Sequence, residues 1–415
     1  MPRVTAVRAL NKCEKSGDWS AAALQKSLKE STLSQPDQAL CLRLFLGVVQ
    51  NRMLLDYYID NLCSSRPELT VRNLLRCGLF QLCFMDRIPP HAAVSETVAA
   101  AGKLRLSRAG GFINAVLRKA ARKELPSLPE GADVSSLSIR YSHALWITEE
   151  LLQQLGSERA EAVLAADNRE APVYIFRNPL CCGEEEFVRQ ISVQALPKLT
   201  DGYIRLEKGS PESDEIFRKG WYYVQDPAPR QAIQMAAPAP GEYILDACAA
   251  PGGKSFACAM LTGDRAVIDA ADISERRLKQ VATGARRLGL EGIQTLVADA
   301  TEFRGGPYDL VIADVPCSGL GVIRKKPDIR FKTREEIREL PQLQLRILRN
   351  LAQSVRPGGR VLYSTCTWRS EENRGVVDRF LAENSEFEIR EEREFWPDLD
   401  ETDGFYACLM QRKKI

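Results

Sequence analysis

The fold of this chain is decided by ten residues, Asp246-Ala-Cys-Ala-Ala-Pro-Gly-Gly-Lys-Ser255. The apolar run 243–245 before them predicts a short buried strand, and the run 256–261 after them predicts a helix. Glycines between a strand and a helix let the backbone approach a ligand closely, and the first N–H groups of the helix face that ligand. The stretch therefore predicts a nucleotide-shaped pocket at the carboxyl end of a strand.

Three kinds of pocket compete for this loop. A phosphate-binding loop of the ATPase type needs a glycine five residues before Gly253-Lys254-Ser255, and Cys248 stands there instead. The dinucleotide fingerprint Gly-x-Gly-x-x-Gly is absent. A pocket for S-adenosyl-L-methionine fits best, because the strands that follow end in the acids that such a nucleoside needs.

The length and composition indicate a soluble protein of two or three domains. The chain has 415 residues, of which 45% are apolar and 27% charged, as in globular proteins. The twelve cysteines include no Cys-x-x-Cys pair and there are two histidines, so neither a disulfide framework nor a metal site is expected. With no signal run and no bilayer-spanning apolar stretch, we expect a cytoplasmic monomer without a membrane partner.

Charge is distributed unevenly along the chain. Residues 1–130 carry about +8 and the remainder about −6. A basic front half joined to a mildly acidic second half favours an anionic polymer as partner, whereas a solvated helical surface is the alternative interpretation.

Periodicity and punctuation divide the chain into three domains and a linker. Residues 1–125 carry apolar positions at three- and four-residue spacing and predict an all-α bundle. The proline- and glycine-containing segment 126–140 is expected to be a linker, and 141–228 a small mixed α/β subdomain. Residues 229–415 alternate strands with helices, which predicts a Rossmann-like parallel sheet covered by helices on both faces.

Acids follow three successive strands of that sheet. Asp272 lies about twenty residues after the glycine loop, where a carboxylate accepts hydrogen bonds from both ribose hydroxyls. Asp299 follows the third strand, where it is expected to bind the adenine amino group, and Asp314 follows the fourth. Because ligands of such sheets bind beyond the carboxyl ends of the strands, these acids favour S-adenosyl-L-methionine, and the missing pyrophosphate grip disfavours NAD.

Two of the cysteines also stand at strand ends. Cys317 lies in Asp314-Val-Pro-Cys-Ser-Gly319 after the fourth strand, and Cys366 follows the fifth. Cytosine C5 is a poor nucleophile until a thiolate adds to C6, with an acid such as Asp314 supporting N3. A second group must then act as base so that the thiol leaves, which gives a cysteine pair a purpose beyond that of inert buried residues.

These motifs resemble a known family. Residues 87–94 and 111–118 look like the NusB-type helical RNA-binding domain, and nearly all of 3–415 is similar to the RsmB (Sun) branch of the RNA 5-methylcytosine methyltransferases. The resemblance implies that Cys366 is the nucleophile, that Cys317 assists release, and that the substrate is a cytosine in small-subunit (16S) ribosomal RNA. Together with the strand-end acids, it predicts that the cofactor is bound by Cys248, Ala249, Ala250, Pro251, Gly252, Gly253, Lys254, Asp272, Arg277, Asp299 and Asp314.

Several points stay open at this stage. The family usually carries Arg-x-Asn at the first strand of the small subdomain, whereas this chain has Phe176-Arg177-Asn178, so a role for Arg177 is not assigned. The cations Arg324, Lys325, Lys326 and Arg330 are expected to hold RNA phosphates, with a solvated loop as the alternative. The rival functions are a transfer RNA 5-methylcytosine methyltransferase and a non-catalytic RNA-binding or antitermination-like factor.

Overall fold

The computed structural model describes residues 1–17, 24, 27–28, 32–191, 195–200, 203–206 and 214–414. The chain divides into two compact units. The helical unit comprises Met1–Arg169 together with Ile323–Thr333, and the catalytic unit comprises Glu170–Val322 and Arg334–Ile415. None of the described helices is long and apolar enough to cross a membrane.

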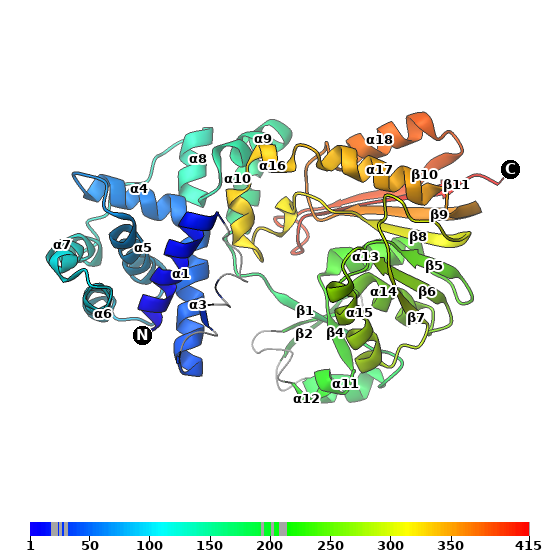
Figure 1. The fold of residues 1–415 in the computed structure, drawn as a ribbon, viewed down its shortest axis with the longest axis horizontal. Helices are drawn as coiled ribbons and strands as arrows, with labels where there is room; N and C mark the ends of the chain where they lie inside the picture. Colours follow the sequence, from blue (N-terminus) through cyan, green and yellow to red (C-terminus); the bar gives the residue numbers. More distant parts are fainter. Residues whose placement is uncertain are drawn as a thin grey trace. The chain divides into compact units, whose positions relative to one another are not determined.

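The helical unit contains no strand among its described residues, which confirms the all-α prediction for the front of the chain (Figure 1). Its core is one cluster of buried apolar side chains contributed by the faces of α1, α3, α4, α5, α6 and α7. Ser34 caps α3 by accepting a hydrogen bond from the backbone N–H of Asp37, and Pro36 stands in the first turn. The described helices are α1 (Pro2–Ser16), α3 (Gln35–Gln50), α4 (Arg52–Leu62), α5 (Leu69–Phe84), α6 (Pro90–Lys103), η1 (Ser107–Ala109), α7 (Gly110–Ala121), α8 (Val134–Tyr141), α9 (Leu145–Leu155), α10 (Ser157–Ala166) and η4 (Pro327–Phe331).

The small α/β part of the catalytic unit is built on a four-stranded antiparallel sheet with strand order β2-β3-β1-β4. Pro197 lies in β2, an edge strand, which is where proline is tolerated in a sheet. Arg177, at the end of β1, donates to the carbonyl of Cys182. The elements are β1 (Val173–Arg177), α11 (Glu184–Ile191), β2 (Ala195–Thr200), β3 (Tyr203–Leu206), α12 (Glu215–Arg218) and β4 (Tyr222–Val224).

The larger part of the catalytic unit is a seven-stranded sheet with strand order β10-β11-β9-β8-β5-β6-β7. The five strands β5 to β9 are parallel, as the alternation of strands and helices predicts, which confirms the Rossmann-like fold. Its elements are α13 (Pro227–Ala236), β5 (Tyr243–Asp246), α14 (Gly253–Leu261), β6 (Val267–Asp272), α15 (Glu275–Leu288), β7 (Ile293–Val297), β8 (Tyr308–Asp314), η3 (Leu320–Val322), α16 (Arg334–Ile337), α17 (Leu340–Ala352), β9 (Val355–Thr365), α18 (Arg374–Glu383), β10 (Phe387–Phe395) and β11 (Phe405–Arg412).

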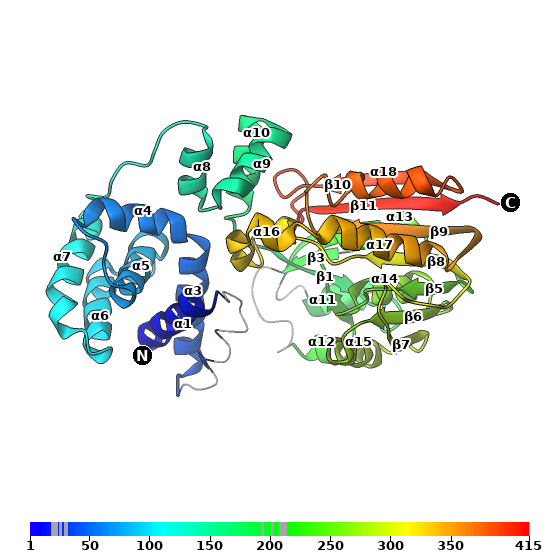
Figure 2. The same ribbon diagram turned by 45° about the horizontal axis from the view of Figure 1, so that its top comes forward.

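Helices cover both faces of this sheet, α13, α14 and α15 on one and α17 and α18 on the other (Figures 1 and 2). Successive strand residues point to opposite faces, so Ile244 packs with the first group of helices and Leu245 with the second. Leu362 and Tyr363 of β9 divide in the same way. Burial on both faces explains why these strands are continuous apolar runs in the sequence.

Two parts of the structure differ from the sequence-based picture. Helix α8 lies within the segment expected to be a linker, capped by Asp133 through the N–H groups of Ser135 and Ser136. Strands β10 and β11 pair antiparallel at one end of the sheet, so the sheet is mixed rather than wholly parallel. Arg412 belongs to β11 and donates to the carbonyl of Val355.

Candidate active site

The glycine loop joins β5 to α14 as predicted. Gly252 has a φ of +116°, and a Cβ there would lie 2.4 Å from the Phe256 ring, so only glycine fits. No side chain caps the helix, which leaves its first N–H groups to a ligand. Asp246 at the end of β5 is fully buried and accepts from Ser255 Oγ at 2.6 Å. Burial raises its pKa to about 6 against the lowering effect of that hydrogen bond.

The predicted acids lie at three strand ends, and two of them contact the loop. Asp272 is nearly buried, accepts from the Ala250 N–H at 3.3 Å, and lies 3.3 Å from an Arg277 guanidinium nitrogen. Arg277 also donates to the Ala250 carbonyl at 2.7 Å. Asp299 is exposed, and hydrogen bonds from Thr301 lower its pKa. The structure thus gathers Asp272 and Arg277 at the loop and shows no contact between Asp299 and that pair.

Asp314 ends β8 and is held from two sides. One carboxylate oxygen lies 2.6 Å from Lys254 Nζ, and the other accepts from Ser364 Oγ at 2.8 Å. Lys254 is mostly buried, and burial lowers its pKa. The effect of burial is outweighed by the negative charge of Asp314, by its hydrogen bond with Lys254, and by the charges of Asp246 and Cys366. The net pKa of Lys254 is therefore raised, and its ammonium stays charged.

The two strand-end cysteines meet. Cys317 Sγ and Cys366 Sγ lie 3.2 Å apart, and the Cys366 N–H points to Cys317 Sγ at 3.3 Å. Their strands are neighbours, with Asp314 of β8 opposite Ser364 of β9. The hydrogen bond with Cys366 raises the pKa of Cys317 well above the ordinary thiol value, and burial and nearby negative charges act in the same direction.

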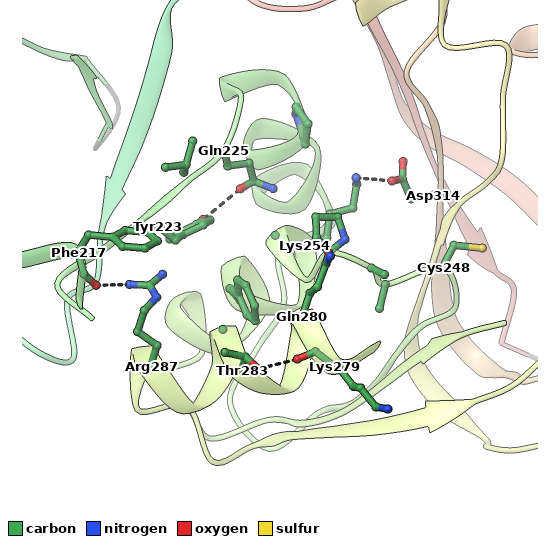
Figure 3. Close-up of a pocket in the computed structure, with 18 of the residues that line it drawn as sticks. Phe217, Tyr223, Gln225, Cys248, Lys254, Lys279, Gln280, Thr283, Arg287 and Asp314 are labelled. Atoms are coloured by element: carbon green, nitrogen blue, oxygen red, sulfur yellow. Dashed lines mark hydrogen bonds and ion pairs between the residues drawn. The ribbon is translucent and has the colours of Figure 1, made fainter. Parts of the chain in front are cut away.

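A cavity of about 1180 Å³ opens beside the loop and Lys254 (Figure 3). Its inner wall is the loop with Lys254 and Asp314, and its outer wall is formed by β4 and α15. Gln225, which the sequence analysis did not single out, lines it. Arg230 donates to the Tyr223 hydroxyl at 3.2 Å and that hydroxyl donates to Gln225 Oε1 at 3.1 Å, so the relay leaves the Gln225 amide N–H₂ turned into the cavity. A polar residue directly after a short strand is the sequence signal for such a position.

The expected basic loop does not behave as a unit. Arg330 is 1% exposed and donates to the backbone carbonyls of Gln50, Tyr141, Ser142 and Asp167 within the helical unit. The prediction that it holds RNA phosphates was therefore wrong, because Arg330 is buried and its Nη1 and Nη2 groups donate to main-chain oxygens. Lys325 and Lys326 are exposed, and Arg324 is half-buried.

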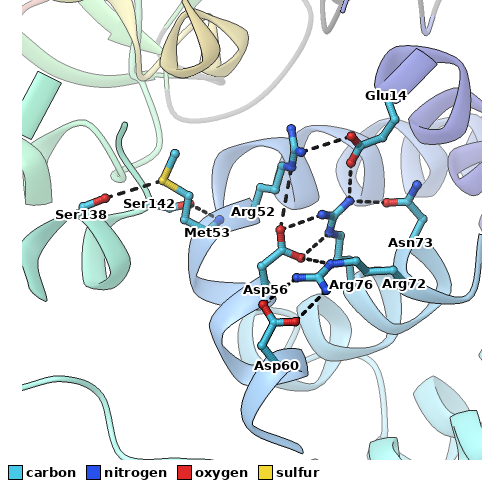
Figure 4. A network of polar contacts seen from close by, with 10 residues as sticks. All are labelled: Glu14, Arg52, Met53, Asp56, Asp60, Arg72, Asn73, Arg76, Ser138 and Ser142. Atoms are coloured by element: carbon cyan, nitrogen blue, oxygen red, sulfur yellow. Dashed lines mark hydrogen bonds and ion pairs between the residues drawn. The ribbon is translucent and has the colours of Figure 1, made fainter. Parts of the chain in front are cut away.

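Two groups of cations in the front half differ in their burial. Arg72 and Arg76 are nearly buried and pair with Asp56, Asp60 and Glu14 in one network (Figure 4). The second group is exposed throughout and consists of Lys103, Arg105, Arg108, Arg118, Lys119, Arg122 and Lys123. Only the second group has charge to offer to an anionic partner, although Arg122 is paired with Glu124.

The strand order, the glycine loop and the strand-end acids define a Rossmann-like class I methyltransferase. Residues 233–411 match the model of the 16S rRNA methyltransferase RsmB/F family, and residues 1–122 match the NusB family. The chain is 33% identical to ribosomal RNA small subunit methyltransferase B of Klebsiella pneumoniae subsp. pneumoniae, over 92% of both chains. It is 31% identical to the protein of that name from Escherichia coli O127:H6, also over 92% of both.

Among solved structures, a methyltransferase homologue from Pyrococcus horikoshii matches with a TM-score of 0.59 and 24% identity, covering 68% of this chain and all of its own. That likeness shows the shared fold. The chain belongs to the RsmB/F family of 16S rRNA methyltransferases.

Proposed function

We propose that this protein methylates C5 of a cytosine in small-subunit ribosomal RNA, with S-adenosyl-L-methionine as the methyl donor, through a covalent bond between Cys366 Sγ and C6. Cys317 assists the release of Cys366 from the product. The observation that carries the proposal is the pair of sulfurs 3.2 Å apart at adjacent strand ends, beside the ion pair of Lys254 and Asp314.

The residues at the loop fit the proposed cofactor. When bound, S-adenosyl-L-methionine supplies a methyl group on a positively charged sulfur. The carboxylates around the loop suit such a cation. Asp246, Asp272 and Asp314 stand at the ends of β5, β6 and β8, which are neighbours in the sheet, and one oxygen of buried Asp246 has no hydrogen-bond partner. Gly252, Asp272 and Arg277 would hold the nucleoside portion, as the family resemblance implies.

The chain's own groups then have distinct tasks in the reaction. Cys366 Sγ adds to C6 of the cytosine, which makes C5 nucleophilic. Asp314, held beside the Lys254 ammonium, supports the ring nitrogen N3 and so stabilises the adduct. After methyl transfer the C5 proton must leave before the bond between Cys366 and C6 breaks, and Cys317 is the group placed to assist that step.

A mechanism-based trap tests the proposal. Small-subunit RNA carrying 5-fluorocytosine cannot lose the group at C5, so wild-type protein should form a stable adduct that peptide mass spectrometry maps to Cys366. Cys366→Ala should form none, whereas Cys317→Ala should accumulate an adduct with ordinary RNA. Cys181→Ala is the matched control, because that thiol is exposed in the small α/β part. An adduct that maps to Cys317 alone contradicts the assignment of roles.

Bisulfite mapping of cellular RNA with and without the protein tests the substrate. The expected result is one cytosine of small-subunit ribosomal RNA that loses protection in the absence of the protein. A transfer RNA position that changes instead would support the rival substrate. Calorimetry with S-adenosyl-L-methionine separates an enzyme from a non-catalytic RNA-binding factor, which would bind no cofactor.

A further inference from the structure

Glu372 is a fully buried carboxylate directly behind the thiol pair. Its Oε2 accepts from the Ser318 N–H at 2.8 Å and from Gln344 Nε2 at 2.9 Å, and its Oε1 faces Arg369 at 3.4 Å. A buried charge of this kind is costly unless it is fully hydrogen-bonded. Because one of its partners is the residue next to Cys317, its position bears directly on that sulfur.

The hydrogen bonds around Glu372 hold both neighbours of Cys317. Gln344 Nε2 donates to the Pro316 carbonyl at 2.9 Å as well as to Glu372, so one amide and one carboxylate clamp residues 316 and 318. Ser318 Oγ donates to Thr367 Oγ1 at 2.8 Å, which ties the same turn to the residue after Cys366. The clamp therefore fixes the two sulfurs relative to one another.

The charges near Cys317 differ from the charges near Cys366. After hydrogen bonding and burial, the negative charges of Cys366, Glu372 and Asp314 raise the pKa of Cys317. Arg369 faces Glu372 and also pairs with Glu371 at 2.7 Å, so this group of one cation and two carboxylates is net negative. Cys366, in contrast, has a positive charge nearby. It is among the groups that raise the pKa of Lys254, so the Lys254 ammonium lies close enough to interact with the Cys366 sulfur.

We propose that Glu372 is a positioning residue that holds Cys317 against Cys366 and keeps the single proton of the pair on Cys317, leaving Cys366 as the thiolate. The other proton of the pair goes to solvent. Once Cys366 is bonded to C6, its negative charge no longer raises the pKa of Cys317, so Cys317 releases its own proton to solvent and then accepts the C5 proton. The inference rests on the proposed function, since it explains why two cysteines in contact take different roles, and it assigns Glu372 no contact with the substrate.

The order of alkylation in the wild-type protein is the first test, and it requires no RNA. The thiolate is the form that reacts with iodoacetamide, so a low dose at pH 7 should modify Cys366 at least about tenfold faster than Cys317. Peptide mass spectrometry after limited conversion gives both rates. Faster modification of Cys317 would overturn the inference, and this result does not depend on any variant that could fail to fold.

Glu372→Gln with Glu371→Gln as matched control is the second test. Both changes remove one carboxylate beside Arg369, but Glu371 is exposed and Glu372 is buried. In Glu372→Gln the midpoint of the pH profile for Cys317 alkylation should fall by about one unit, a tenfold gain in rate near pH 8. Glu371→Gln should leave the midpoint where it is in the wild type. Equal shifts in both variants, or none in Glu372→Gln, contradict the inference.

Turnover gives a readout that a purely structural role would not change. Glu372→Gln should lower kcat by about tenfold with the KM for RNA unchanged, because the clamp acts on the reacting sulfurs and not on RNA binding. Should the wild type methylate no cytosine, the proposed function fails, and the alkylation results still decide whether Glu372 places the proton.

Discussion

The two units of this protein both bury charged side chains, but they use them differently. In the helical unit Arg76 is 2% exposed and donates to Asp56, Glu14 and Asn73, so its donors are spent on neighbouring side chains. In the catalytic unit Lys254 pairs with Asp314 at the wall of a cavity. The comparison teaches that a closed network of charges stabilises a fold, whereas a charge pair that borders a cavity is available for chemistry.

The largest expected effect comes from breaking the closed network. Arg76→Met keeps the length of the buried side chain and leaves the half-buried carboxylates of Asp56 and Glu14 without this partner. Loss of one member of a buried ionic network costs about 3–5 kcal/mol, so the free energy of unfolding of the helical unit should fall by that amount. Urea denaturation followed by circular dichroism measures it.

The control for that change is Arg122→Met, whose partner Glu124 is exposed like itself. Exposed pairs contribute about 0–1 kcal/mol, so this variant should unfold close to the wild type. Both variants should bind S-adenosyl-L-methionine with unchanged affinity, since both changed residues belong to the helical unit. An Arg76→Met protein that unfolds within 1 kcal/mol of the wild type would show that the network is not a source of stability.

The pair of Lys254 and Asp314 at the cavity wall should matter for catalysis and not for the stability of the fold. Lys254→Met should reduce the rate of methyl transfer at least about a hundredfold, because a preorganised charge at the reacting groups is lost. Initial rates with small-subunit RNA measure the effect. Lys279→Met is the matched control, since Lys279 lines the same cavity but is 73% exposed. Similar losses in the two variants would mean that the cavity needs positive charge in general and not the pair with Asp314.

Much of this fold was visible in the sequence because its strands are buried on both faces. Each of β5, β6, β8 and β9 contains a short apolar run that is followed by a polar or glycine-rich stretch, and this pattern places the acids and both cysteines at the carboxyl ends of the parallel strands. Strand β10 escaped notice because five of its central residues are exposed and charged, which hides any alternation.

The parts that sequence reasoning missed are buried polar residues. Glu372 and Gln344 are fully buried, yet in the sequence they resemble ordinary surface residues of a loop and a helix. Arg330 is the reverse case, since its place in a run of cations suggested exposure while four carbonyls enclose it. Such positions are set by partners distant in the sequence, so composition and periodicity carry no sign of them.

A smaller effect is expected from pH. Asp167 is buried beside His143 in the helical unit, and burial raises its pKa to about 7, against the lowering effect of Arg330. An acid whose pKa is raised on folding disfavours the folded state once it ionises, so its penalty is absent below about pH 4 and grows as pH rises toward 7.

Asp167→Asn removes that ionisation and keeps the shape. The variant should gain on the order of 1–2 kcal/mol relative to the wild type as pH rises from about 4 to about 7, and the gain should stay level above pH 7. Thermal unfolding at several pH values checks it, with Asp133→Asn as the exposed control. A difference between variant and wild type that does not change with pH would show that Asp167 is ionised at no cost.

The smallest expected effect on stability comes from the exposed cations, and it separates their role from that of Arg76. Arg105→Ala combined with Lys119→Ala should change the free energy of unfolding by less than about 0.5 kcal/mol, since both side chains are exposed. If these residues contact phosphates, RNA affinity at about 0.1 M salt should fall about five- to tenfold, and the salt dependence should flatten by about 0.7 for each lost contact. Fluorescence anisotropy with a small-subunit RNA fragment measures both quantities. Arg374→Ala with Arg379→Ala on α18 removes the same charge from the catalytic unit. An equal loss in that pair would mean that net charge, and not this surface of the helical unit, attracts the RNA.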